Sequence, residues 1–190
     1  MTITSRDELR AAQAPLKDRY RQDPGAAITP VRAEAEFSDP GVTATVASWN
    51  NSTVRTGLHT ATGGDGSDAC SADLLMQALV ACAGVTLRSV ATAMALDVRS
   101  ATLVADAVFD ARGTLGLDRS VDVGVQRVRV LATVDTDAGD DDLARLAAST
   151  ERYCVVGQSL RSPPAIVIRR ADAAGGDTAR PETATESPRS

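Results

Sequence analysis

Three cysteines and a single histidine are the side chains in this sequence best suited to chemistry. Cys70, Cys82 and Cys154 form an odd set without the dense spacing of a secreted disulfide framework, so we expect free thiols in a reducing compartment. Zinc needs about four ligands, and these cysteines offer no Cys-x-x-Cys pair to join His59. The sequence therefore predicts thiol chemistry that needs no metal.

The surroundings of each cysteine differ. Cys82 lies among small apolar residues of an expected helix, where a cysteine is typical of a small hydrophobic core residue. Cys154 falls between expected helices at 141–152 and 155–160, where free backbone amides can favour a thiolate. Cys70 precedes the long helix in a loop and is interpreted as a surface thiol. Position alone leaves both a structural and a reactive role open for Cys82 and Cys154.

The element that positions Cys82 is a predicted helix at residues 72–96. Ser71 can cap it, and Asp73 would place a carboxylate at its positive end. Residues 74–85 have almost no polar face, which predicts burial on all sides. Because a domain this small rarely encloses a helix completely, we expect a second copy of the chain to cover it.

Strands are expected on both sides of that helix. Alternating apolar residues and turn signals predict an antiparallel meander of strands at 28–37, 42–49 and 53–62. Two further strands are expected at 98–111 and 121–134, joined by a hairpin at 115–118. A helix at 141–152, capped by Asp140, Asp141 or Asp142, and a helical segment at 155–160 should follow. The last expected element is a strand at 165–168. The pattern predicts an α+β fold with antiparallel sheets around a buried central helix.

Length and composition indicate one domain. The chain has 190 residues, of which 43% are hydrophobic, enough for a substantial core. Residues 1–27 read as a helical arm, with an amphipathic helix at 5–22, and residues 28–170 as the domain itself. Residues 171–190, rich in Ala, Thr, Pro, Ser and Gly, are expected to be disordered.

Charge and hydropathy bear on partners and location. A net charge of −5 and a pI near 4.9 argue against nucleic acid, which is bound by clustered Lys and Arg. The N-terminus lacks an apolar signal core, and the longest apolar stretch, residues 78–87, is interrupted and shorter than the ~20 residues of a membrane span. We expect a cytoplasmic protein without membrane or nucleic-acid partners.

Two segments carry a family resemblance. Residues 71–88 (SADLLMQALVACAGVTLR) and 153–160 (YCVVGQSL) resemble the two cysteine motifs of the OsmC/Ohr family, osmotically inducible and organic hydroperoxide resistance proteins, in the family's order. The resemblance extends over residues 31–170. It implies an OsmC-like fold in an intertwined homodimer, with sites at the subunit interface.

The resemblance also implies a reaction. A two-cysteine thiol peroxidase would reduce organic hydroperoxides or hydrogen peroxide, with Cys82 as the attacking thiolate and Cys154 as the partner in a disulfide. A dithiol reductant would restore both thiols, and neither a metal nor an organic cofactor is required.

A thiolate in apolar surroundings needs a neighbouring cation, because desolvation raises the pKa of a thiol. The family supplies an arginine from a preceding strand, which makes Arg55 the candidate here, although a solvated strand arginine is the alternative. Asp73 is the candidate acid that orients Arg55. Arg88 lies on a different helix face from Cys82 and is expected to serve packing or an ion pair. His59 could share a strand face with Arg55, but a surface histidine is preferred.

Two other functions remain open at this stage. A non-catalytic dimeric module could bind a small apolar molecule between its central helices. A redox sensor could change the shape of the dimer when Cys82 and Cys154 form a disulfide.

Overall fold

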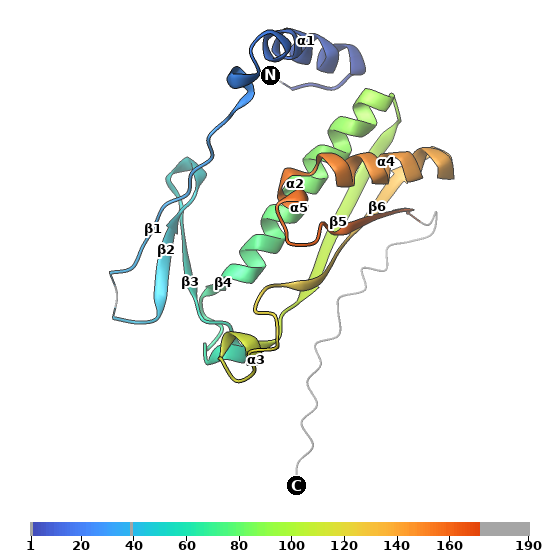
Figure 1. The fold of residues 1–190 in the computed structure, drawn as a ribbon. Coiled ribbons are helices and arrows are strands. Elements are labelled where there is room, and N and C mark those ends of the chain that lie inside the picture. The colour runs from blue at the N-terminus through green and yellow to red at the C-terminus, as the bar shows by residue number, and fades with distance from the viewer. Residues whose placement is uncertain (1, 39, 172–190) are drawn as a thin grey trace.

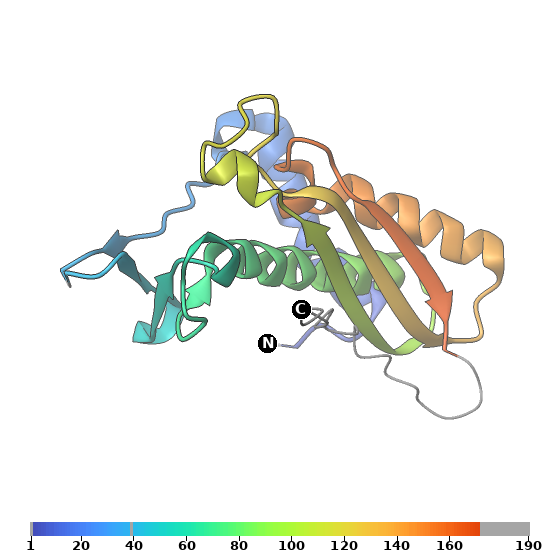
Figure 2. The same ribbon diagram turned by 90° about the horizontal axis from the view of Figure 1, so that it is seen from below.

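The computed structural model describes residues 2–38 and 40–171, the side chain of Trp49 excepted. A long helix, α2 (Ser71–Met94), lies at the centre of the chain (Figure 1). One small sheet lies beyond the start of this helix and a second runs along its length (Figure 2). The expected α+β class is confirmed. The expected tail at 171–190 falls, apart from Ala171, outside the described residues.

The N-terminal helix follows its prediction closely. α1 (Arg6–Gln22) is preceded by Ser5, whose hydroxyl accepts the N–H of Glu8 while the Glu8 carboxylate returns to the backbone of Ser5. Only Leu9 is buried, and the helix packs on α2. A short 3₁₀ turn, Pro24–Ala27, ends the arm.

The N-terminal sheet is shorter than the sequence suggests. Its strands are β1 (Ala35–Glu36), β2 (Thr43–Ala47), β3 (Thr53–Gly57) and β4 (Ala69–Cys70), in that spatial order. The predicted strand at 28–37 is wrong over most of its length, because β2 is only five residues long and Pro30 has no N–H to donate. The predicted strand at 53–62 ends at Gly57, because the His59 ring accepts the N–H of Ala61 and turns the chain into a 3₁₀ helix, Thr60–Thr62.

The central helix is buried along one face only. Leu79, Ala83, Leu87 and Ala91 recur every four residues and are at most 1% exposed. On another face, Val85 is 73% exposed. Burial on all sides is therefore not achieved within one chain. The predicted cap is also corrected, since Cys70 and not Ser71 precedes the first turn.

The C-terminal sheet has the order β5 (Val98–Val108), β6 (Gln126–Thr136) and β7 (Ala165–Arg170). β5 and β6 are antiparallel, but β7 lies parallel to β6, as β4 does to β3. Both sheets are thus mixed, which corrects the expectation of antiparallel sheets. The cause is topological: the helical connection between β6 and β7 returns the chain to the same end of the sheet.

The connection between β5 and β6 is longer than the expected hairpin. Asp110 accepts the N–H of Arg112 and pairs with its guanidinium, and these contacts begin a short helix, α3 (Ala111–Thr114). β6 consequently starts at Gln126, five residues after the predicted start.

Two helices link β6 to β7. α4 (Asp140–Tyr153) begins after Gly139 rather than after a capping aspartate, with its three aspartates in the first turn. α5 (Val155–Gln158) follows at once, so that a single residue, Cys154, separates the two helices. α4 packs against both α2 and β7.

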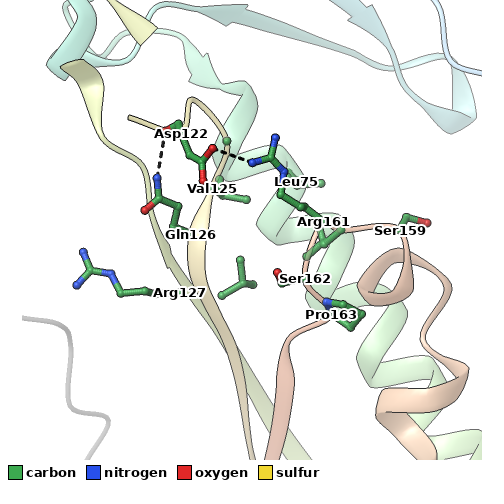
Figure 3. A pocket seen from close by; sticks show the side chains of 12 residues that line it. Leu75, Asp122, Val125, Gln126, Arg127, Ser159, Arg161, Ser162 and Pro163 are labelled. Carbon is green, nitrogen blue, oxygen red and sulfur yellow. Dashed lines mark hydrogen bonds and ion pairs between the residues drawn. The ribbon is translucent and has the colours of Figure 1, made fainter. Parts of the chain in front are cut away.

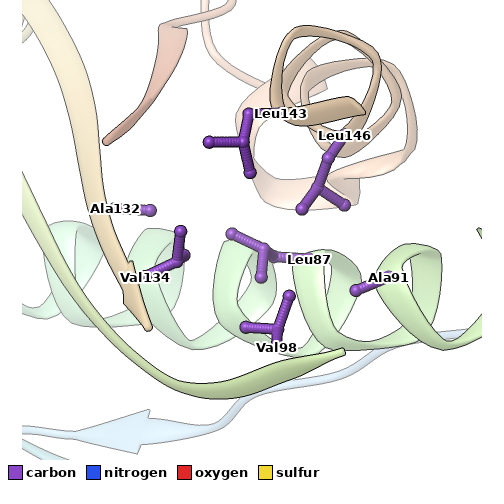
Figure 4. Packing of buried hydrophobic residues seen from close by; sticks show 7 residues of the cluster. All are labelled: Leu87, Ala91, Val98, Ala132, Val134, Leu143 and Leu146. Carbon is purple, nitrogen blue, oxygen red and sulfur yellow. The ribbon is translucent and has the colours of Figure 1, made fainter. Parts of the chain in front are cut away.

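The main core lies between α2, α4 and the sheet. Leu87 and Ala91 of α2 face buried residues of the neighbouring elements (Figure 4). These neighbours are Val98, Ala132, Val134, Leu143 and Leu146. The contact fixes α2 against the sheet and so determines where Cys82, slightly more than one helical turn before Leu87, comes to lie.

The prediction that no segment has the length of a membrane span is corrected. α2 has 24 residues and is apolar enough to cross a membrane by length and composition alone. Core helices of soluble proteins satisfy the same criterion, and α2 packs against β5, α4 and α5.

Candidate active site

The fold brings Cys82 and Cys154 together. Cys154 is 1% exposed and belongs to a second buried cluster with Leu79, Ala83 and Val130, against which the half-buried Cys82 packs. Both are free thiols. The contact arises because α5 packs on α2, and Cys154 immediately precedes α5.

Cys154 is held by the junction between two helices. Its backbone N–H donates to the carbonyl oxygen of Thr150 at 3.0 Å, which ends α4. Its sulfur accepts the N–H of Gly157 at 3.4 Å, which starts α5. Burial raises the pKa of the Cys154 thiol, and the neighbouring Cys82 raises it further, against the lowering effect of the Gly157 amide. Cys154 is therefore the thiol that stays protonated.

The pKa of the Cys82 thiol is shifted in the opposite direction from that of Cys154. Burial acts to raise the pKa of its thiol, but several hydrogen bonds to the sulfur outweigh this, and the pKa lies below its ordinary value. The donors, from strongest to weakest effect, are the Val156 amide, the Cys154 thiol, the Thr86 hydroxyl and the Val155 amide. These donors are uncharged, so dipoles rather than an ion pair favour the thiolate in this chain.

This arrangement pairs a thiol that ionises easily with one that keeps its proton. The easily ionised thiol can act as a nucleophile, because the thiolate is the reactive form. The protonated thiol lies in contact with it, as a second cysteine must if the two are to be joined after oxidation.

Arg55 and Asp73 lie elsewhere in the single chain. Arg55 is on β3, where its guanidinium pairs with the Asp68 carboxylate at 3.3 Å and its side chain is 57% exposed. Asp73 is exposed in the first turn of α2, about 13 Å along the helix axis from Cys82. The roles predicted for Arg55 and Asp73 remain predictions.

Two further sequence interpretations are revised. Cys70 is half-buried rather than a surface thiol, and it lines a cavity of about 370 Å³ together with His59. His59 lies beyond the end of β3, so it does not share a strand face with Arg55, and its ring meets that of Phe109 edge-on at 5.2 Å. Arg88 donates to the carbonyl oxygen of Val98, in keeping with the packing role expected of it.

Several groups that contact Cys82 were not anticipated. Thr86 follows Cys82 by four residues, and this helical spacing could have indicated the contact. The amides of Val155 and Val156 gave no such signal, since their approach depends on how α5 packs on α2. Asp68 was also missed as the partner of Arg55.

A cavity of about 480 Å³ lies between the start of α2, the start of β6 and the segment after α5, and neither Cys82 nor Cys154 lines it (Figure 3). Val128 and Leu160 line the cavity and also pack against the buried cluster that contains Cys154. The Arg161 guanidinium and the Asp122 carboxylate form an ion pair of 2.8 Å at the cavity. The cavity thus combines an apolar lining with a charged pair. Among the described residues, no group of three or more His, Cys, Asp or Glu side chains could hold a metal ion.

Comparison with known proteins agrees with this architecture. A family model described as OsmC-like protein matches residues 64–169. Three organic hydroperoxide resistance proteins of known structure share the fold. The protein from Elizabethkingia anophelis is 14% identical, with 75% of this chain and 97% of that chain covered and a TM-score of 0.59. The protein from Legionella pneumophila is 14% identical, with 76% of this chain and 98% of that chain covered and a TM-score of 0.56. OhrB of Bacillus subtilis is 16% identical, with 76% of this chain and 100% of that chain covered and a TM-score of 0.53. No curated protein matches the sequence.

Proposed function

This chain belongs to the family of OsmC-like proteins, and on that premise we propose that it is a two-cysteine thiol peroxidase that reduces hydroperoxides. The observation that carries the proposal is the contact between Cys82 and Cys154, in which the pKa of one thiol is lowered and the pKa of the other is raised. Three structural neighbours named organic hydroperoxide resistance proteins support the substrate class.

The first step is oxidation of Cys82. Its thiolate attacks the distal oxygen of the hydroperoxide, an S–O bond forms, and the O–O bond breaks. The leaving alkoxide takes a proton and departs as the alcohol. Cys82 is left as a sulfenic acid, oxidised by two electrons, and the peroxide is reduced by two.

The second step joins the two cysteines. The Cys154 sulfur attacks the sulfenic sulfur of Cys82, a disulfide forms, and the hydroxyl leaves as water with the proton of the Cys154 thiol. An external dithiol then reduces the disulfide by exchange and is itself oxidised to a disulfide. Both cysteines return to thiols, and neither a metal nor an organic cofactor takes part.

The cavity of about 480 Å³ favours organic hydroperoxides over hydrogen peroxide as substrates. Leu75, Val125 and Leu160 offer apolar contacts for a hydrocarbon chain, which hydrogen peroxide lacks. This preference predicts a higher kcat/KM for cumene hydroperoxide than for hydrogen peroxide.

We also propose that the active species is a homodimer. Only four of the 24 residues of α2, namely Leu79, Ala83, Leu87 and Ala91, are buried within one chain, and Val85 is 73% exposed. In the N-terminal segment Ile28, Val31 and Phe37 are each more than 80% exposed. Apolar surface of this extent is typical of a chain that completes its core with a partner. In such a dimer, Arg55 of the partner subunit, oriented by Asp73, would lie near the Cys82 thiol. Within one chain, the donors to the Cys82 sulfur are uncharged.

The proposal is tested by the mass of the reduced protein after one equivalent of cumene hydroperoxide, with peptide mapping. Loss of two hydrogens mapped to Cys82 and Cys154 is expected in the wild type. Cys154→Ser should instead trap a sulfenic acid on Cys82, and Cys82→Ser should leave Cys154 reduced. Cys70→Ser is the matched control and should behave as the wild type. Three reduced thiols after peroxide treatment of the wild type would exclude the peroxidase.

A further inference from the structure

Gly157 lies inside a helix although its backbone does not require glycine. It belongs to α5, is buried, and is not one of the glycines with positive φ, which are Gly63, Gly66 and Gly116. Glycine is among the least favourable residues in a helix, where alanine is usually the better choice. A departure from a local rule of this kind directs attention to what surrounds the residue.

The surroundings of Gly157 leave little room for a side chain. A Cβ added at Gly157 would lie 3.3 Å from the sulfur of Cys154 and 3.5 Å from the Cβ of Cys154. The same atom would lie 3.5 Å from Cδ of Pro164, which is buried. The contact of 3.3 Å is closer than a Cβ normally approaches another atom, so the sulfur would have to move by a few tenths of an ångström.

The backbone of Cys154 is held on both sides, which leaves the sulfur as the atom that yields. The N–H of Cys154 donates to the carbonyl oxygen of Thr150 at 3.0 Å, and its own carbonyl oxygen accepts the N–H of Gln158 at 2.9 Å. The sulfur accepts the N–H of Gly157 at 3.4 Å. Gly157 therefore both binds the sulfur of Cys154 and leaves the space that the sulfur occupies.

We infer that Gly157 is a positioning residue that holds the sulfur of Cys154 where it can attack the oxidised Cys82. The inference rests on the proposed function for the identity of this step. In the step, an S–S bond forms as the S–O bond of the sulfenic acid breaks, and the hydroxyl leaves as water with the proton of the Cys154 thiol. Because the rate of such an attack depends on the alignment of the reacting atoms, a displaced sulfur should slow it.

The first test follows the two oxidation steps separately in Gly157→Ala. Reduced protein receives one equivalent of cumene hydroperoxide, and the reaction is stopped at increasing times with dimedone, which traps sulfenic acid, and N-ethylmaleimide, which blocks free thiols. Peptide mass spectrometry then measures the sulfenic acid on Cys82 and its disulfide with Cys154. Gly139→Ala is the matched control, because its added Cβ meets no atom within 4 Å.

Gly157→Ala should affect the second step and spare the first. Sulfenic acid should form on Cys82 at the wild-type rate, and kcat/KM for the peroxide should stay unchanged because it reports the steps up to cleavage of the O–O bond. Disulfide formation should slow by about three- to thirtyfold. Gly139→Ala should match the wild type in both steps. Disulfide formation at the wild-type rate in folded Gly157→Ala overturns the inference.

A second test addresses the contact itself and needs no oxidant. Thermal unfolding of the reduced protein compares the effect of Gly157→Ala in the wild-type and Cys154→Ala backgrounds. Because Cys154→Ala removes the sulfur, the fall in Tm caused by Gly157→Ala should be smaller in that background. An equal fall in both backgrounds overturns the inference, as does a failure to fold in both.

A third measurement separates this inference from the peroxidase. Oxidised glutathione forms a mixed disulfide with Cys82, releasing one glutathione, and Cys154 then displaces the second. Gly157→Ala should slow this displacement relative to Gly139→Ala. Slower displacement in a protein that consumes no hydroperoxide would refute the peroxidase and leave the role of Gly157 intact. Displacement at the rate of Gly139→Ala overturns that role.

Discussion

Cys82 packs against the buried cluster that contains Cys154, and the nearness of the two sulfurs acts to lower the pKa of Cys82 and to raise the pKa of Cys154. Burial acts in the same direction on both sulfurs and so cannot distinguish them. The amides of Val155 and Val156, which act to lower the pKa of Cys82, help to distinguish the two thiols.

The pH dependence of thiol reactivity should follow these directions. The pKa of Cys82 is lowered, so its thiolate fraction rises at a lower pH than that of an ordinary thiol. The pKa of Cys154 is raised, so its thiolate appears only at higher pH. Labelling midpoints obtained by peptide mapping should place Cys82 below Cys154. The reverse order would contradict the assignment of the attacking thiol.

Cys154→Ala and Cys154→Ser should separate the hydrogen bond from the rest of the side chain. Alanine removes the donor, whereas serine keeps an O–H group at the same position. We expect the labelling midpoint of Cys82 to rise by roughly half to one pH unit in Cys154→Ala, in line with the loss of about 1 kcal/mol. It should rise less in Cys154→Ser. Equal midpoints in the two variants would show that the thiol hydrogen has no such effect.

Val155→Pro should remove one amide donor with little other change. Proline is accepted at the first position of a helix, and Cys154 before it already has an extended backbone, with φ −74° and ψ 101°. Val155→Ala is the reference, because it trims the same exposed side chain but keeps the N–H. Relative to Val155→Ala, the proline variant should label more slowly at Cys82 near pH 7, by about two- to tenfold. Identical labelling profiles would remove Val155 from the donors.

Val85→Asp should dissociate the proposed dimer. Val85 is 73% exposed on α2, and a charge there would lose its hydration if a second chain covered the helix. Val167→Asp is the matched control on β7, on a strand of the C-terminal sheet. Light scattering after size exclusion should give a dimer for the wild type and Val167→Asp and a monomer for Val85→Asp. A monomeric wild type would overturn the proposal.

Long amphipathic or apolar segments and the antiparallel strand pairs were predictable from the sequence, whereas the parallel pairs β3–β4 and β6–β7 were not. The Ser5 cap and apolar periodicity predict α1, and the apolar run around Cys82 predicts α2. The segment at 28–33 has strand-like residues but pairs with no strand among the described residues, and the local pattern does not show which segment could pair with it. The parallel placement of β7 likewise depends on how α4 and α5 return the chain.

The residues of the candidate site also include some that the sequence predicts and others that only the fold reveals. The two cysteine motifs identify Cys82 and Cys154 from the sequence, and the structure places them in contact. The donors to Cys82 come from another helix and depend on tertiary packing, so no local pattern reveals Val155 or Val156. The strand pattern predicts Arg55, but its partner Asp68 lies on a loop that only the fold brings near.

The burial of Cys154 beside Cys82 also affects how readily such a protein would be inactivated by peroxide. A sulfenic acid on Cys82 can react with a second peroxide to give a sulfinic acid, which ordinary dithiols do not repair. Cys154 is 1% exposed and already packed beside Cys82, so the competing disulfide step needs no diffusive encounter. Under the proposed cycle, the inactivating reaction depends on peroxide concentration and the protective one does not. In that cycle, the fraction of protein lost per turnover would rise with peroxide concentration, and the contact between the two cysteines would keep that fraction small.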